Sequence, residues 1–203
     1  MVLFFGDSLA SAENNNFNGF VEKLDLKEYK NYGVSGTTIS DYSLYPVGST
    51  DLISLLFLHK DEVRTAEKIF LCYGCNDITS VTTGYITLNH AIISFVKAAD
   101  LIRQLNMNVK IYFISLGVNI DLIAAGQCRY INSIYLKDTE IRIHRCNWIE
   151  NYKKFELNIS KYVDKVIPID IRLEEYLDKD EIHPNDTGYK LIADIIKNHL
   201  GEI

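Results

Sequence analysis

Proline is scarce in this sequence, with three residues lying far apart at Pro46, Pro168 and Pro184. No tract rich in glycine, serine and proline, and no block of like charge, marks a linker or a disordered tail. The 203 residues, of which 47% are hydrophobic, can bury one sizeable core and are short for two. We therefore expect a single domain over residues 1–203.

Positive charge is also in short supply. The chain has 21 lysine and arginine residues against 27 aspartate and glutamate residues, a formal net charge of -6 and a pI near 5.4. Proteins that bind nucleic acid neutralise phosphates with clustered basic side chains. Anionic membrane surfaces likewise attract basic segments. We therefore expect neither nucleic acid nor an anionic membrane surface as a partner.

Long hydrophobic runs are absent as well. A membrane-spanning helix needs about 20 consecutive, mostly apolar residues, and no segment approaches that length. The N-terminus lacks the basic start, apolar core and cleavage site of a signal peptide. The sequence predicts no membrane span and a cytoplasmic location.

Cysteine occurs at four positions. Cys72 and Cys75 have the spacing of a redox motif, but a thioredoxin-like site needs its first cysteine at a helix N-terminus, whereas Cys72 continues an apolar run. The separation of Cys128 and Cys146 matches no spacing of paired zinc ligands. The segment after the first apolar run also has too few hydroxyls for a flavin phosphate loop. We expect thiols that serve packing, and neither a metal nor a cofactor.

The sequence does contain a regular alternation of two patterns. Short apolar runs typical of buried strands lie at residues 2–5, 29–34, 68–73, 109–115 and 163–171. Segments with helical periodicity lie at residues 17–24, 51–63, 88–105, 140–162 and 187–200. This alternation predicts an α/β fold with a parallel sheet of about five strands, covered by helices on both faces.

Three segments are candidates for the walls of a substrate pocket. Residues 40–50 and 79–85 are rich in hydroxyl groups and are expected to form loops beside the site. Residues 116–138 are apolar with interspersed polar side chains and show neither period cleanly. This long segment is either a lid or pocket wall, or an ordinary helix with poor periodicity.

The first apolar run ends abruptly in the stretch Phe4-Phe5-Gly6-Asp7-Ser8-Leu9. Open α/β sheets place their ligand-handling groups at the carboxyl ends of buried strands. Ser8 is therefore a candidate nucleophile. Because serine and aspartate also commonly cap helices, a helix cap is the alternative for this stretch.

A base for such a nucleophile is found near the C-terminus, in Asp180-Glu181-Ile182-His183-Pro184. A spacing of three residues lets Asp180 accept a hydrogen bond from one ring nitrogen of His183 while the other nitrogen faces a hydroxyl. Pro184 disfavours a helical conformation at His183 and so keeps it in a loop. Asp178 is the first alternative to Asp180 as the residue that orients the ring.

Hydrogen-bond donors for an oxyanion are available after the second and third apolar runs. Gly36 has no side chain that would stop a substrate from approaching its backbone N–H. The side-chain amide of Asn76 is a neutral donor suited to an oxyanion. Taken singly, the glycine is typical of a turn and Asn76 of a helix cap.

Four blocks of the sequence together resemble the SGNH family of serine hydrolases, also called GDSL esterases. The blocks are Gly6-Asp7-Ser8-Leu9, Gly33-Val34-Ser35-Gly36, Gly74-Cys75-Asn76-Asp77 and Asp180-Glu181-Ile182-His183. They occur in the order found in the family and span nearly the whole chain. The better-known α/β-hydrolases fit less well, because their nucleophile lies in a G-x-S-x-G motif in mid-chain.

The resemblance implies a flavodoxin-like, three-layer α/β/α fold and the hydrolysis of carboxylic esters. It implies that Ser8 is the nucleophile, His183 the base and Asp180 the residue that orients His183. The oxyanion donors would be the N–H of Ser8, the N–H of Gly36 and the side chain of Asn76. By the same comparison, Asp7 and Asp77 hold loops in place and take no part in the chemistry.

The family acts on many substrates, among them O-acetylated carbohydrates, lysophospholipids and thioesters. We favour a short-chain ester of a small molecule or carbohydrate, such as an O-acetylated sugar, because the expected pocket loops are polar. The alternatives are a lysophospholipase or thioesterase for longer acyl chains, and a non-hydrolytic binding module or acyltransferase on the same fold. The sequence makes no prediction about the oligomeric state.

Overall fold

The computed structural model describes residues 1–41, 51–134 and 142–200. Its strands are β1 (Val2–Gly6), β2 (Tyr29–Gly33), β3 (Lys68–Cys72), β4 (Lys110–Ser115) and β5 (Lys165–Pro168). They form one five-stranded parallel sheet in the order β2-β1-β3-β4-β5. Gly6 of β1 is level with Gly33 of β2 and with Cys72 of β3, so the segments that leave these three strands begin side by side.

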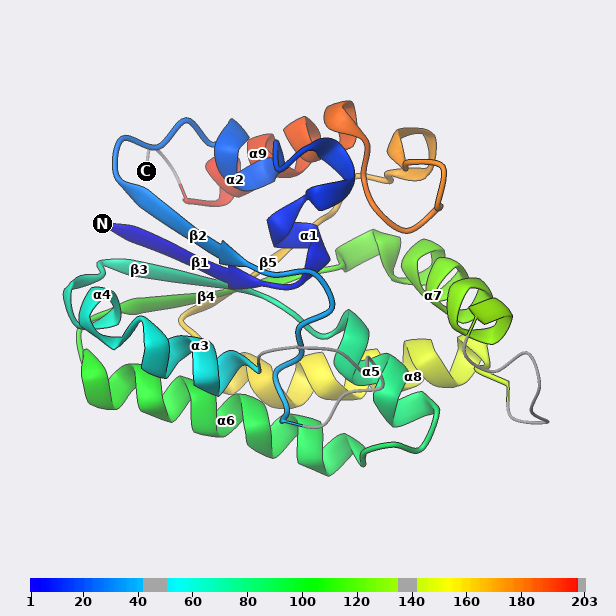
Figure 1. Ribbon diagram of the computed structural model, residues 1–203, viewed down its shortest axis with the longest axis horizontal. Coiled ribbons are helices and arrows are strands. Elements are labelled where there is room, and N and C mark those ends of the chain that lie inside the picture. Colours follow the sequence, from blue (N-terminus) through cyan, green and yellow to red (C-terminus); the bar gives the residue numbers. More distant parts are fainter. Residues whose placement is uncertain (42–50, 135–141, 201–203) are drawn as a thin grey trace.

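Helices connect successive strands. They are α1 (Ser8–Ser11), α2 (Phe20–Lys23), α3 (Leu52–Leu58), α4 (Lys60–Thr65), α5 (Cys75–Thr82), α6 (Leu88–Leu105), α7 (Ile120–Ile134), α8 (Arg145–Ile159) and α9 (Asp186–Leu200). Short 3₁₀ turns occupy Glu13–Asn15, Gly117–Asn119, Ser160–Tyr162 and Glu174–Tyr176. Helices α2 and α9 cover one face of the sheet, and α3, α6 and α8 cover the other (Figure 1).

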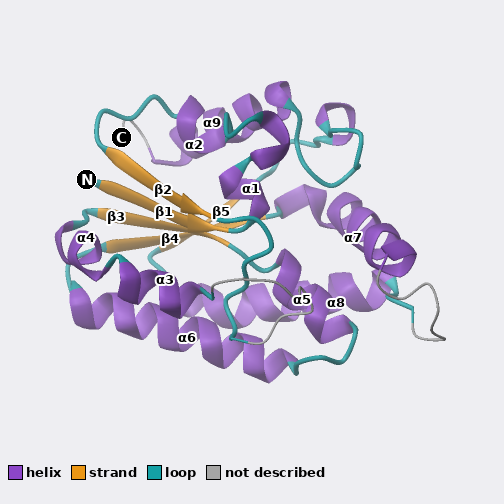
Figure 2. Ribbon diagram, in the orientation of Figure 1, coloured by secondary structure: helices purple, strands orange, loops and turns teal. Residues whose placement is uncertain are grey.

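This arrangement is the three-layer α/β/α fold expected from the sequence, and the predicted parallel sheet is confirmed. The sheet order changes direction at β1, because β2 pairs with one of its edges and β3 with the other. Ligand sites of open α/β sheets lie outside the carboxyl ends of the strands at such a switch point. Helices α1, α5 and α7 lie toward this end of the sheet (Figure 2).

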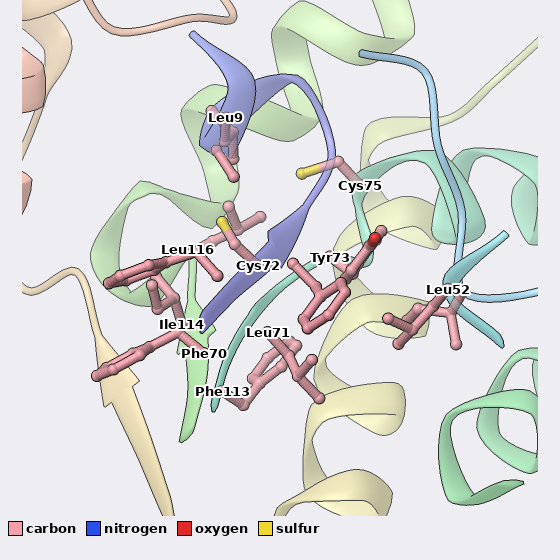
Figure 3. Packing of buried hydrophobic residues seen from close by; sticks show 14 of the residues in the cluster. Leu9, Leu52, Phe70, Leu71, Cys72, Tyr73, Cys75, Phe113, Ile114 and Leu116 are labelled. Carbon is pink, nitrogen blue, oxygen red and sulfur yellow. The ribbon is translucent and has the colours of Figure 1, made fainter. Parts of the chain in front are cut away.

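The central strands are apolar on both faces because both faces are covered. Phe4 stacks on Phe70 with ring centroids 4.7 Å apart and meets Phe20 of α2, whereas Phe113 packs on the opposite side against Phe95 of α6. Figure 3 shows part of this core, including Leu71 and Phe113, which are level with each other in β3 and β4. Burial on both faces explains the unbroken apolar runs.

The thiols of Cys72 and Cys75 belong to the same core. Both side chains are buried and neither forms a disulfide. Figure 3 shows their sulfur atoms near Leu9, among other apolar side chains. Burial raises the pKa of each thiol well above its ordinary value, which suppresses the reactive thiolate.

Several element boundaries differ from the sequence predictions. The expected helix over 51–63 is divided into α3 and α4 at His59, and only four residues of the segment 17–24 are helical. The strand expected over 163–171 is limited to Lys165–Pro168. In the segment 116–138, the expectation of a helix is correct, since α7 extends over Ile120–Ile134. Side chains of α7, among them Leu122 and Arg129, also line two cavities, so the helix is a cavity wall as well. Residues 42–50 of one expected pocket loop, together with 135–138 and 140–141, lie outside the described residues.

The expectation that residues 79–85 form a loop is wrong for its first half. Thr79, Ser80 and Thr82 belong to α5, and their hydroxyls donate to the carbonyls of Cys75, Asn76 and Ile78 one turn earlier. Such bonds satisfy the hydroxyls of buried serine and threonine side chains inside a helix. Because these residues are polar although they face the interior, the helical periodicity of the segment is not visible in the sequence. Thr79 and Ser80 are fully buried, so they do not line a substrate pocket.

Candidate active site

Ser8 lies directly after the central strand β1, as the first residue of α1. The chain can turn there because Gly6 has no side chain: a Cβ atom at this position would lie 2.4 Å from the Cβ of Ala10 and 2.9 Å from the carbonyl oxygen of Cys72. Asp7 caps α1 through a 3.0 Å hydrogen bond from the backbone N–H of Leu9 to its Oδ1. In this sharp turn, Ser8 remains partly exposed at the end of the sheet.

A tight turn before α9 carries Asp180 and His183. Its backbone is closed by hydrogen bonds from the N–H of Asp178 to the carbonyl of His183 and from the N–H of Glu181 to the carbonyl of Asp178. Glu181 has a φ of 58°, in the left-handed region that non-glycine residues rarely adopt. Asp180 Oδ1 accepts the N–H groups of Ile182 and His183, both at 2.9 Å. We call residues 178–184 the histidine turn.

The structure brings Ser8, His183 and Asp180 into one chain of hydrogen bonds. His183 Nδ1 lies 2.5 Å from Asp180 Oδ2, and His183 Nε2 lies 2.7 Å from Ser8 Oγ. An ionised carboxylate can only accept, so Nδ1 carries the ring proton and the neutral ring accepts the Ser8 hydroxyl at Nε2. The side chain of His183 is only 20% exposed, which limits its access to solvent.

Asp180 is held in the ionised form. Partial burial disfavours its charge, but the hydrogen bonds from the His183 ring and from the N–H groups of His183 and Ile182 outweigh burial and lower the pKa of Asp180 to about 2. The carboxylate can therefore orient His183 and stabilise a positive charge on the ring at any pH above about 4. Asp178, the alternative orienting residue, makes no contact with the ring: its carboxylate oxygens accept from Lys179 N–H and from the Asn14 amide.

The segments that follow β2 and β3 are tied to each other and to β1. The Thr37 hydroxyl donates to the carbonyl of Gly6, and the Thr37 carbonyl accepts a 2.8 Å hydrogen bond from Asn76 Nδ2. This second bond uses one hydrogen of the Asn76 amide and fixes the direction of the other. Asp77 accepts the N–H groups of Ile39 and Ser40 and the Ser40 hydroxyl, as expected for a residue that holds a loop.

Backbone donors are available beside Ser8. Within the described part of the chain, no acceptor takes the N–H of Ser8 or of Gly36. The Ser8 N–H is in the first turn of α1, where helical N–H groups have no partner within the helix. Gly36 has a φ of 78° and open space around it, so its backbone is accessible to a bound molecule.

Asp7, the residue before Ser8, has an unusual environment for a carboxyl group. It is 1% exposed, and its Oδ2 has no hydrogen-bond partner among the described residues. Burial raises the pKa of Asp7 to about 7, partly offset by the bond from Leu9 and by the proximity of His183. Asp7 therefore supports the turn at Ser8 and carries a proton through most of the acidic range.

One contact near the site was not foreseen from the sequence. Asn14, in the 3₁₀ turn after α1, donates to the carbonyl of Pro184, the residue that follows His183. The only signal in the sequence is the run Asn14-Asn15-Asn16, which is typical of turns and does not indicate a distant partner.

Two cavities adjoin the histidine turn. One has a volume of about 570 Å³ and is lined by Asp180, Arg129, Tyr130, Asn132, Ser133 and Arg142. The other, of about 620 Å³, is lined mainly by charged side chains, among them Arg172, Lys179, Glu174 and Glu181. A cavity of about 840 Å³ next to Met1 and Lys68 lies at the amino ends of the strands, away from Ser8.

The described residues contain no group of three or more histidine, cysteine, aspartate and glutamate side chains that could hold a metal ion. In the same ranges, no helix is both long and apolar enough to cross a bilayer.

Comparison with solved structures identifies the fold. A Parabacteroides merdae protein assigned as a GDSL-like lipase is similar to this chain with a TM-score of 0.63 and 14% sequence identity, over 98% of this chain and 94% of that one. The chain has the SGNH hydrolase fold. The acetyl xylan esterase AlAXEase shares the SGNH fold with a TM-score of 0.61 and 16% identity, over 98% of each chain. The inhibitor-bound aryl esterase of M. smegmatis is similar with a TM-score of 0.63 and 12% sequence identity, over 100% of this chain and 99% of that one.

The likeness lies in the fold and not in the overall sequence. No family model and no curated protein matches the chain. The identities to these three structures are only 12–16%. The SGNH fold nevertheless extends over essentially the whole chain.

Proposed function

We propose that the protein is a serine esterase that hydrolyses carboxylic esters through an acyl-enzyme. The observation that carries this proposal is the chain of hydrogen bonds from Ser8 through His183 to Asp180. A serine hydroxyl is a weak nucleophile unless a base takes its proton, and the ring nitrogen 2.7 Å from Ser8 Oγ is placed to do so. The esterases that share the fold support the same reaction class.

In the first half of the reaction, Ser8 Oγ attacks the ester carbonyl while its proton passes to His183 Nε2. The carbonyl oxygen becomes an oxyanion, which would be stabilised by the N–H groups of Ser8 and Gly36 and by the free hydrogen of the Asn76 amide. Asp180 stabilises the imidazolium. The tetrahedral intermediate collapses when the ester C–O bond breaks and His183 returns the proton to the leaving alcohol.

In the second half, a water molecule replaces the alcohol. His183 takes a proton from the water as its oxygen attacks the acyl carbon, and a second oxyanion forms in the same place. When the bond to Ser8 Oγ breaks, the proton returns to the serine and the carboxylic acid is released. Ser8, His183 and the oxyanion donors are thus used twice, and no cofactor takes part.

For the substrate we propose a short acyl group on a polar alcohol, such as an O-acetylated small molecule or carbohydrate. The hydroxyls of Thr79 and Ser80 no longer support this proposal, because they are buried in α5. The support comes from the charged side chains that line the larger of the two cavities beside the histidine turn. A long acyl chain gains about 0.8 kcal/mol per buried methylene only where the wall is apolar.

The test is covalent labelling with a fluorophosphonate, which reacts with activated serines whatever the natural substrate. We expect one adduct per chain, which peptide mapping assigns to Ser8, and no adduct in the His183→Ala variant. Labelling at another serine, or no labelling of the native protein, would show that Ser8 is not an activated nucleophile and would favour a binding module. Labelling without hydrolysis of simple esters would favour an acyltransferase.

A further inference from the structure

The side chain of Asn14 connects the segment that carries Ser8 to both ends of the histidine turn. Its Nδ2 donates to the carbonyl of Pro184 at 3.0 Å and to Asp178 Oδ2 at 3.2 Å. Its Oδ1 accepts the hydroxyl of Tyr189 at 2.9 Å. Both amide hydrogens and the amide oxygen of Asn14 are thus engaged by partners that lie 164 to 175 residues away in the sequence.

These contacts hold the histidine turn at the points where it could open. Pro184 directly follows His183, and the backbone N–H of Asp178 bonds to the His183 carbonyl at 2.7 Å. Asn14 itself is held on both sides. It lies in the 3₁₀ turn that continues from α1, where the N–H of Asn15 bonds to the Ala12 carbonyl, and Tyr189 on α9 is fully buried.

We propose that Asn14 is a positioning residue that keeps His183 Nε2 at bonding distance from Ser8 Oγ, a role that rests on the proposed esterase function. The 2.7 Å bond between Ser8 and His183 breaks if the histidine turn moves outward. Misplacing a catalytic group by about 1 Å can cost on the order of 10²-fold in rate. Asn14 touches none of the reacting atoms. Its loss therefore acts through the position of His183, and so on the chemical step.

The same loop offers a matched control. Asn18 Nδ2 donates to Asp186 Oδ1 at 3.2 Å, which is also a bond from this loop to the C-terminal part of the chain. Asp186 begins α9 and lies outside the histidine turn. Asn18→Ala therefore removes one bond of the same kind without loosening His183.

The experiment compares Asn14→Asp, Asn14→Ala and Asn18→Ala. Asn14→Asp keeps the shape of the side chain and the acceptor for Tyr189, but a carboxylate cannot donate to Pro184 and repels Asp178. The readouts are the rate constant for fluorophosphonate labelling of Ser8, kcat and KM on p-nitrophenyl acetate, and the melting temperature, which verifies that each variant is folded during the assay.

We expect both Asn14 variants to label roughly 10- to 100-fold more slowly than the native protein and to lose kcat with little change in KM. Asn18→Ala should stay within about twofold of the native protein, as is usual for surface substitutions. Native labelling rates in Asn14→Asp, or an equal loss in Asn18→Ala, would overturn the positioning role while leaving the esterase proposal intact. Absence of labelling in the native protein would instead refute the esterase proposal itself.

Discussion

His183 Nε2 lies 2.7 Å from Ser8 Oγ although 175 positions separate the two residues in the chain. The contact joins the first turn after the central strand to the last turn before the C-terminal helix. Because neither side chain could acquire this geometry from local structure, the contact depends on the packing of α9 and the histidine turn against the N-terminal segments.

Substitutions at the candidate site should fall into two classes. Ser8→Ala and His183→Ala are expected to lower kcat by roughly 10⁴- to 10⁶-fold, because they remove the nucleophile or its base. Asn76→Ala should lower kcat by only about 10²- to 10³-fold, the usual effect of removing one oxyanion donor.

Steady-state kinetics on p-nitrophenyl acetate, with circular dichroism to verify folding, measures both classes. Asn76→Ala also leaves the Thr37 carbonyl without its partner, so a loss of stability of about 1–3 kcal/mol should accompany the loss of rate. A loss for Asn76→Ala as large as that for Ser8→Ala would mean that Asn76 acts mainly through the fold.

The buried carboxyl of Asp7 should make the stability of the protein depend on pH. Its pKa is about 7 in the folded protein and near 3.8 when exposed, so unfolding releases a proton between these values. Above its ordinary pKa this group costs stability, and the cost grows until the pH passes about 7. At about 1.4 kcal/mol per pH unit, the full cost is at most about 4.5 kcal/mol.

The variant Asp7→Asn isolates this contribution, because it keeps an acceptor for the Leu9 N–H and cannot ionise. Urea unfolding of the native protein and the variant at pH 4.5 and pH 8 provides the measurement. We expect the stability of the variant, relative to the native protein, to increase between the two values. A stability difference between variant and native protein that is the same at pH 4.5 and pH 8 would show that Asp7 is ionised in the folded state at both pH values.

Gly126 should be intolerant of any side chain because α7 packs directly on the histidine turn. A Cβ atom at this position would lie 2.7 Å from the carbonyl oxygen of Glu181, which is backbone and cannot move alone. Gly126→Ala, which in an exposed helix would add about 0.5–1 kcal/mol of stability, should here destabilise the protein and lower kcat by at least about tenfold.

Ile134→Ala is the control, since Ile134 is an exposed residue of the same helix and lines neither of the two cavities beside the histidine turn. Its melting temperature and kcat should equal those of the native protein within error. If Gly126→Ala raises the melting temperature and leaves kcat unchanged, then α7 and the histidine turn are separated more widely than the structure shows.

The length of the acyl chain tests the proposed substrate class. On a series of p-nitrophenyl esters, kcat/KM should fall from acetate to octanoate, because charged side chains line the larger cavity beside the histidine turn. In competition, an O-acetylated sugar should inhibit hydrolysis more strongly than a lysophospholipid. A rate that climbs steadily up to octanoate would favour a lipid esterase or thioesterase.

The sequence by itself determined the architecture and the candidate residues at the strand ends. Strands buried on both faces must be apolar throughout, so runs such as Val2–Gly6 are visible without any knowledge of their neighbours. Parallel strands deliver their carboxyl ends to one edge, so the polar residues that follow β1 and β3 had to lie near each other. The contact between Asp180 and His183 likewise depends only on a local turn of three residues.

Only the tertiary structure decided where the remaining side chains point. The hydroxyls of Thr79 and Ser80 look like a polar pocket wall in the sequence, but α5 directs them to its own carbonyls in the interior. The partners of Asn14, with Asp178 among them, depend on which segments α9 brings together. Long-range packing sets these contacts, and their free energy is not encoded in any local pattern of residues.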